Sequence, residues 1–66
     1  MNELEFLTGA LHYYNIEIIS VNGTRITVGR GYEIELEANG IYKLLSNNQV
    51  VAPFNDVNEL CQFILL

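Results

Sequence analysis

Three glutamates at alternate positions form the densest group of chemically active side chains in this sequence. Glu33, Glu35 and Glu37 are separated by single residues, and on a β-strand this spacing places three carboxylates on one face, about 7 Å apart. Such carboxylates could ligate a divalent cation if further oxygens converged on it. Arg25 and Lys43 are expected to lie beside Glu35, however, so we predict a solvated acidic surface and no metal site.

The remaining candidates for catalysis are isolated from one another. The 66 residues include one histidine, His12, and one cysteine, Cys61. Acid–base or nucleophilic catalysis would need a second group held beside one of them, and the sequence provides none with any specificity. Cys61 has no base within four residues, whereas a reactive cysteine needs an electropositive setting. We therefore predict a protein that is not an enzyme and that has no cofactor.

The charge balance limits the classes of partner. Eight acidic residues face three basic ones, and the net charge is −5. Binding to a nucleic-acid backbone or to an anionic membrane depends on basic side chains, so neither is expected, and a basic protein surface is the expected partner. Because the sequence shows no signal peptide and no apolar run near the roughly 18 residues of a membrane span, a cytoplasmic location is expected.

Two helices are predicted, one near each end of the chain. Asn2 and Glu5 have the spacing of a capping box, and helical spacing of the apolar residues that follow predicts a helix over residues 3–14. Asn55 or Asp56 is expected to cap the second helix. The apolar face of that helix consists of Val57, Leu60, Cys61 and Ile64.

The first helix has a second apolar face. Phe6, Gly9, Ala10 and Tyr13 lie nearly opposite the leucines that would face a core. A helix that is apolar nearly all round is normally buried on more than one side, and one layer of sheet covers only one side. The last four residues are apolar as well. We therefore predict a two-fold dimer, and its contact residues are Phe6, Gly9, Ala10, Tyr13, Phe63 and Leu66.

Between residues 16 and 45 the apolar period changes to two, which is typical of strands. We predict three-residue loops, each a type I turn followed by a left-handed glycine, at Gly23, Gly31 and Gly40. A two-residue loop at Asn22-Gly23 is rejected because it would divide the isoleucines between the two faces of the sheet. The predicted register pairs Ser20 with Thr24, Ile18 with Ile26, Ile16 with Val28, Val28 with Tyr32, Ile26 with Ile34, Leu36 with Tyr42 and Ile34 with Leu44.

These elements predict one two-layer α+β domain over residues 1–66. Its antiparallel β-meander has four or five strands and is covered on one face by an N-terminal and a C-terminal helix. The fifth strand, Val50-Val51-Ala52, is left open because Pro53 lacks a backbone donor and marks a strand end or a sheet edge. The uncovered face should carry a row formed by Arg25, Glu35 and Lys43.

The uncovered face is the predicted partner-binding surface, and its contact residues are Glu17, Glu33, Glu35, Glu37, Ile41 and Leu45. In its size, acidity and helix–meander–helix order the chain resembles small accessory proteins of phages and mobile elements. Some of those proteins block bacterial defence enzymes by binding basic surfaces, so the resemblance implies an inhibitor that occludes a basic site. The alternative is a homo-oligomeric structural protein, or one that binds a small ligand between subunits.

Overall fold

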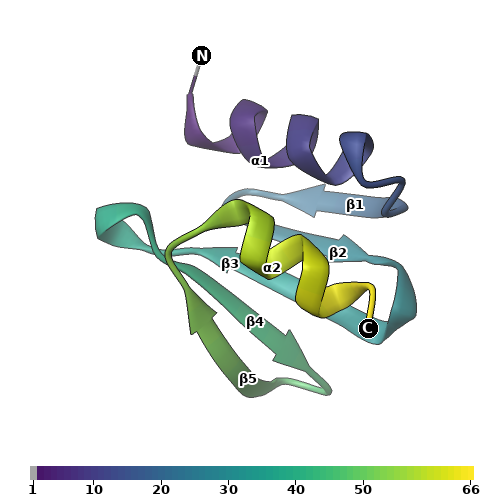
Figure 1. Cartoon of the computed structure of the whole chain (residues 1–66). Coiled ribbons are helices and arrows are strands. Elements are labelled where there is room, and N and C mark those ends of the chain that lie inside the picture. Colours follow the sequence, from purple (N-terminus) through teal and green to yellow (C-terminus); the bar gives the residue numbers. More distant parts are fainter. Residues whose placement is uncertain (1) are drawn as a thin grey trace.

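Two helices and a five-stranded antiparallel sheet make up the fold (Figure 1). The computed structural model describes residues 2–66. The helices are α1 (Glu3–Tyr13) and α2 (Val57–Ile64). The strands lie side by side in chain order: β1 (Ile18–Asn22), β2 (Arg25–Val28), β3 (Tyr32–Leu36), β4 (Tyr42–Ser46) and β5 (Gln49–Phe54). The predicted α+β class and meander are confirmed, and the fifth strand is present.

The predicted cap of α1 is confirmed, and of the two candidate caps of α2 the structure has Asp56. The Glu5 amide donates to Asn2 Oδ1 at 2.8 Å, and the Asn2 amide donates to Glu5 Oε1 at 3.1 Å, which completes the capping box. Asp56 Oδ1 accepts hydrogen bonds from the amides of Asn58 at 2.8 Å and Glu59 at 3.3 Å. These bonds satisfy amides that have no acceptor inside the helix, so the two helix starts are fixed locally.

The core lies between the helices and one face of the sheet. Both helices pack on that face, with α1 nearest β1 and α2 against β4 and β5 (Figure 1). The largest fully buried side chains of the core are Leu7, Leu11, Ile26, Ile34, Leu44, Leu60 and Ile64. Burying each such side chain stabilises the fold by about 1.5–3 kcal/mol relative to exposure. This face of the sheet therefore holds the two layers together.

The register across β2, β3 and β4 is the predicted one. Ile34 lies opposite Ile26 on one side and Leu44 on the other, and Leu36 lies opposite Tyr42. Because side chains alternate along a strand, this register places all the buried residues of the central strands under the helices.

The predicted register of the first hairpin is wrong. β1 and β2 pair Asn22 with Arg25, so the loop between them contains two residues, Gly23 and Thr24. Gly23 has a φ of +65°, and a left-handed glycine at the first of two loop positions is typical of a type II′ hairpin turn. The register continues with Val21 opposite Ile26 and Ser20 opposite Thr27.

A bulge in β1 accounts for the difference. The register shifts between Ile18, which lies opposite Val28, and Ser20, so Ile19 is the extra residue. The prediction assumed an uninterrupted strand with its isoleucines facing the core. A bulge interrupts the alternation once. Ile19 is therefore 60% exposed, while Ile16, which precedes the strand, stays buried.

The other three hairpin loops contain consecutive left-handed residues. The pairs are Arg30-Gly31, Asn39-Gly40 and Asn47-Asn48. A left-handed pair matches the right-handed twist of the flanking strands, and glycine and asparagine adopt it at least cost. The positive φ predicted for Gly31 and Gly40 is confirmed. The predicted type I turn is not, because the residue before each glycine is left-handed as well.

Candidate functional site

The face of the sheet away from the helices is here called the open face. It carries two columns of side chains, one along β3 and one along β4, whose members lie opposite each other. Glu33 lies opposite Leu45, and Glu35 lies opposite Lys43. Beyond the strand ends, the Glu37 amide donates to the Ile41 carbonyl at 2.8 Å and extends the same register. Five of the six predicted contact residues therefore share this face: Glu33, Glu35, Glu37, Ile41 and Leu45.

Glu17, the sixth predicted contact residue, lies apart from the other five. It precedes β1, and β2 separates that edge of the sheet from β3. The Glu17 carbonyl accepts a hydrogen bond from the Gly29 amide at 2.9 Å, and its side chain lies against Gly29. Glu17 is exposed there, outside the two columns of the open face.

Ion pairs organise the carboxylates of the open face. Arg25 Nε donates to Glu35 Oε1 at 2.8 Å, and its Nη1 donates to Glu33 Oε1 at 3.1 Å. Lys43 lies opposite Glu35 in the register, but its Nζ pairs with Glu37 Oε1 at 3.6 Å. The expected row of Arg25, Glu35 and Lys43 is therefore present, but the ion pair of the Lys43 ammonium is with Glu37. The long lysine side chain reaches the neighbouring carboxylate instead.

The protonation state of Glu35 follows from these contacts. The Thr24 hydroxyl donates to Glu35 Oε2, and this bond, followed by that from Arg25, holds the pKa of Glu35 below its ordinary value of 4.5. The bond to Glu35 in turn raises the pKa of Arg25. Both groups are charged at neutral pH, so three carboxylates and two bases leave this part of the open face with one net negative charge.

Apolar side chains flank the charged group on the open face. Leu45 is only 5% exposed, although it faces away from the core, and it lies between Glu33 on β3 and Val50 on β5. Val50 and the bulge residue Val51 are exposed. These two valines were not among the predicted contact residues, because the sequence left it undecided whether residues 50–52 form a strand. The run Val50-Val51 beside Pro53 was the available signal for an exposed apolar edge strand.

A second exposed surface lies on α1. Phe6 is 50% exposed and Tyr13 is 80% exposed. With Gly9 and Ala10 they border a hollow of about 360 Å³ between α1 and the start of α2. The Tyr14 hydroxyl donates to the Asn58 side chain at 2.9 Å and joins the two helices beneath this hollow.

The C-terminal residues predicted for self-association do not join that surface. The Phe63 ring packs inside the chain, with its centroid 5.5 Å from that of Phe54 and 6.4 Å from that of Tyr32. Leu66 is exposed, and its carbonyl oxygen lies 3.5 Å from Arg30 Nη1 near the β2–β3 loop. The sequence could not anticipate this separation, because it depends on where the end of α2 meets the sheet.

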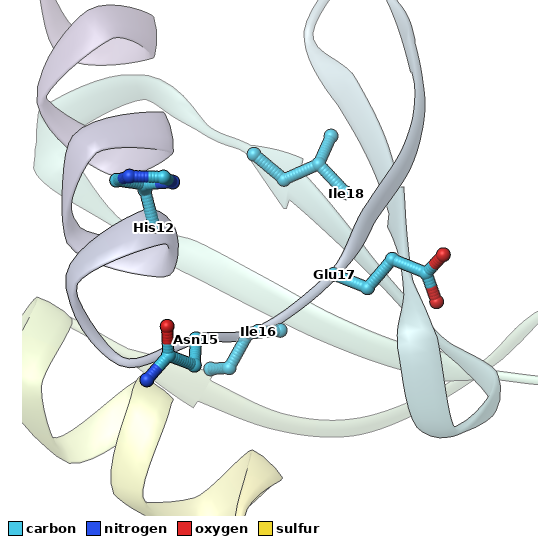
Figure 2. Close-up of a pocket in the computed structure, with 5 residues that line it drawn as sticks. All are labelled: His12, Asn15, Ile16, Glu17 and Ile18. Atoms are coloured by element: carbon cyan, nitrogen blue, oxygen red, sulfur yellow. The ribbon is translucent and has the colours of Figure 1, made fainter.

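Neither His12 nor Cys61 forms a catalytic arrangement in the described structure. His12 borders a hollow of about 300 Å³ that is also lined by Asn15, Glu17 and two isoleucines. In Figure 2 the Glu17 carboxylate points away from the His12 ring, so the two do not form an acid–base pair. Cys61 is buried, and burial raises the pKa of its thiol to about 11. Its neutral thiol is therefore a small apolar side chain of the core.

The described residues show no metal site and no membrane-spanning helix, and known proteins give no match. Among residues 2–66 no three His, Cys, Asp or Glu side chains come together in a way that could hold a metal ion. In the same part of the chain, neither helix is long and apolar enough to cross a membrane. Comparisons with protein families, with curated proteins and with solved structures found no match.

Proposed function

We propose that this chain is a non-catalytic protein-binding domain whose open face covers a basic site on a partner protein. An inhibitor of the kind that phages and mobile elements carry would act in this way. The observation that supports the proposal is the shared placement of Glu33, Glu35 and Glu37 on a sheet face that neither α1 nor α2 covers. Ile41, which is partly exposed, lies in the adjacent column and supplies apolar contact area, whereas Leu45 is buried within the chain.

The internal ion pairs favour short-range recognition. Arg25 and Lys43 contact Glu33 and Glu37 through Oε1 alone, which leaves Oε2 of each carboxylate for a base of the partner. A carboxylate accepts several hydrogen bonds at once and binds arginine most strongly when two are formed together. Because the internal pairs already restrict these side chains, binding costs less conformational entropy than it would for freely moving glutamates.

The other acids supply long-range attraction. Glu3, Glu5, Glu17, Asp56 and Glu59 have no Lys or Arg nitrogen within 4.0 Å among the described residues. They account for most of the net charge of −5, and uncompensated charge of one sign steers an oppositely charged partner and raises the association rate. The association rate with the partner should therefore fall steeply as salt is added.

A capture experiment tests the proposal. The tagged protein would be exposed to a lysate of its source organism, and the retained proteins identified by mass spectrometry and then purified. We expect one partner with a basic surface, whose complex weakens with salt and with Glu37→Lys. Glu3→Lys is the matched control, because it makes the same charge change on the helix side of the molecule.

Two results would contradict this assignment. One is a purified partner that binds the Glu37→Lys and Glu3→Lys variants with equal affinity, which would remove the open face from the contact. The other is a complex that is indifferent to salt. Titration calorimetry of the two variants against the purified partner measures both properties.

A homo-oligomeric protein is the second candidate, and the exposed rings of Phe6 and Tyr13 favour it. The two candidates are compatible, since α1 lies on the opposite side of the sheet from the open face.

A further inference from the structure

The exposed surface of α1 has the same order of large and small side chains in both directions along the helix, so it can pair with a second copy of itself. Phe6 precedes Gly9 by three residues, and Tyr13 follows Ala10 by three. Large, small, small and large side chains therefore follow one another along the same stripe of the helix. When two such helices cross in opposite directions about a point between Gly9 and Ala10, each large side chain meets a large one, and the small residues meet at the centre.

Gly9 has no role in the packing of one chain that would require glycine. It lies inside α1, and a Cβ added to it would meet no atom within 4 Å. Glycine is the least favourable residue after proline in the interior of a helix. A glycine here is explained by the close approach of another backbone from outside the chain.

We infer that two copies of this chain pair through α1 in an antiparallel two-fold contact, with Phe6 against the partner's Tyr13 and Gly9 against the partner's Ala10. The partner's α1 packs over the hollow between α1 and α2, whose remaining walls are Glu5, Tyr14, Val57 and Asn58. A two-fold contact of this kind repeats every interaction once. The inference does not depend on the proposed function.

Charge favours the antiparallel direction. Glu5 borders the hollow, and a parallel pair would place it beside the partner's Glu5. In the antiparallel register the two are nine positions apart along the helix, about 13 Å at 1.5 Å per residue. That separation exceeds the roughly 8 Å over which physiological salt screens exposed charges. The helix dipoles also oppose each other in this arrangement.

The two exposed rings supply part of the area that a specific dimer needs. Phe6 is 50% exposed and Tyr13 is 80% exposed. Since an aromatic side chain buries about 150–250 Å² in full, covering the two rings would bury about 200–300 Å² more per subunit. That is about half of the roughly 500 Å² per partner at the lower limit for a specific interface, and the walls of the hollow supply further area.

Gly9→Leu separates association from folding. The Cβ at residue 9 enters open space in one chain, and leucine suits a helix better than glycine, so the variant should fold at least as well as the parent. In the dimer it would hold the two helices apart, and we expect the dimer dissociation constant to rise about tenfold or more. His12→Leu adds a leucine outside the surface and should leave the dimer intact.

Light scattering and circular dichroism over a dilution series measure mass and folding together. The parent should have twice the mass of one chain at high micromolar concentration. A folded parent that stays monomeric there would overturn the inference. So would a Gly9→Leu variant that dimerises as tightly as the parent.

A charge exchange tests the direction of the helices. Phe6→Glu alone should give a monomer, and adding Tyr13→Lys should restore the dimer, because the antiparallel register sets each new acid against a new base. A parallel pair would instead set like charges together. A double variant that remains a folded monomer would overturn the antiparallel register, and a Phe6→Glu variant that still dimerises would overturn the surface itself.

Discussion

The two faces of the sheet are built from alternate residues of the same strands, but different interactions hold their side chains in place. On the face under the helices, Ile26, Ile34 and Leu44 are 0% exposed and touch other apolar side chains. On the open face, Arg25 and Glu35 occupy the intervening positions and are joined by hydrogen bonds while still partly exposed. One face is dry, and the other is a charged surface in contact with water.

The two faces therefore have different roles. The covered face supplies folding free energy, and the open face fixes the positions of its charged side chains. Burying an apolar side chain contributes about 1.5–3 kcal/mol, whereas an exposed ion pair contributes about 0–1 kcal/mol in general. Most of the folding free energy should therefore come from the covered face. The ion pairs of the open face fix where its carboxylates lie, which matters for binding a partner.

Leu44 and Leu45 give the most direct comparison, because they are neighbours in β4 that face opposite sides of the sheet. Leu44→Ala leaves a cavity in the core and should cost about 2–5 kcal/mol, enough to unfold much of so small a domain. Leu45→Ala should cost roughly 1–2 kcal/mol, because its neighbours on the open face can relax and water can enter. Urea denaturation measures both, and equal losses would contradict the division between the faces.

The sequence predicted the parts of the fold that local patterns determine. Asn2 and Asp56 identified the helix starts because a capping side chain bonds to amides only two or three residues away. The register of β2, β3 and β4 followed because both sides of Ile34 offered matching apolar partners. The same register placed Glu33, Glu35 and Glu37 on one face, so most of the candidate surface was predictable.

The wrong register of the first hairpin and two further details depend on features that local patterns do not determine. A bulge at Ile19 cannot be recognised from apolar spacing, because the extra residue is itself apolar. Lys43 lies opposite Glu35 as expected, but the pattern did not show that its ammonium pairs with Glu37. Phe63 was grouped with α1 because it is apolar, and the pattern did not show that its ring packs on Phe54. Each of these features depends on tertiary contacts.

At alkaline pH, ionisation of a thiol on the covered side of the sheet should lower the folding stability. Burial raises the pKa of the Cys61 thiol to about 11, from an ordinary value of 9.0, and burial also raises the pKa of Tyr42. As pH rises above 9, the thiol of the unfolded chain loses its proton before that of the folded chain. Stability should therefore fall between pH 9 and 11, by on the order of 1–3 kcal/mol.

Denaturation midpoints across that pH range, for the parent and for Cys61→Ala, measure the contribution of the thiol. The variant should be less stable at neutral pH because of lost packing, and its stability should fall less between pH 9 and 11. Parallel alkaline profiles for the two proteins would contradict the assignment to Cys61.

Removing Arg25, the central base of the open face, should lower the folding stability less than the changes on the covered face do. Arg25→Gln deletes the contacts to both Glu33 and Glu35 and leaves these two carboxylates without their shared cation. We expect a small fall in the urea midpoint at low salt that nearly vanishes at high salt, because screening weakens exposed ion pairs. A large loss that persists in salt would mean that the open face also contributes strongly to the folding free energy.

The smallest effect should appear in acid, and it belongs to the open face. The hydrogen bonds from Thr24 and then Arg25 hold the pKa of Glu35 below its ordinary 4.5. The folded chain therefore binds this proton less readily than the unfolded chain. The stability that this shift contributes is fully present above the ordinary pKa and is lost as pH falls from about 4.5 through the folded value.

Glu35→Gln removes the titrating group, and Thr24→Val removes the largest cause of the shift, so both should flatten the acid side of the stability profile. Neither should alter the alkaline side, where Cys61 acts from the other face of the sheet. Urea midpoints from pH 3 to pH 6 measure this effect, and an acid side that keeps its slope in both variants would mean that other carboxyl groups determine it.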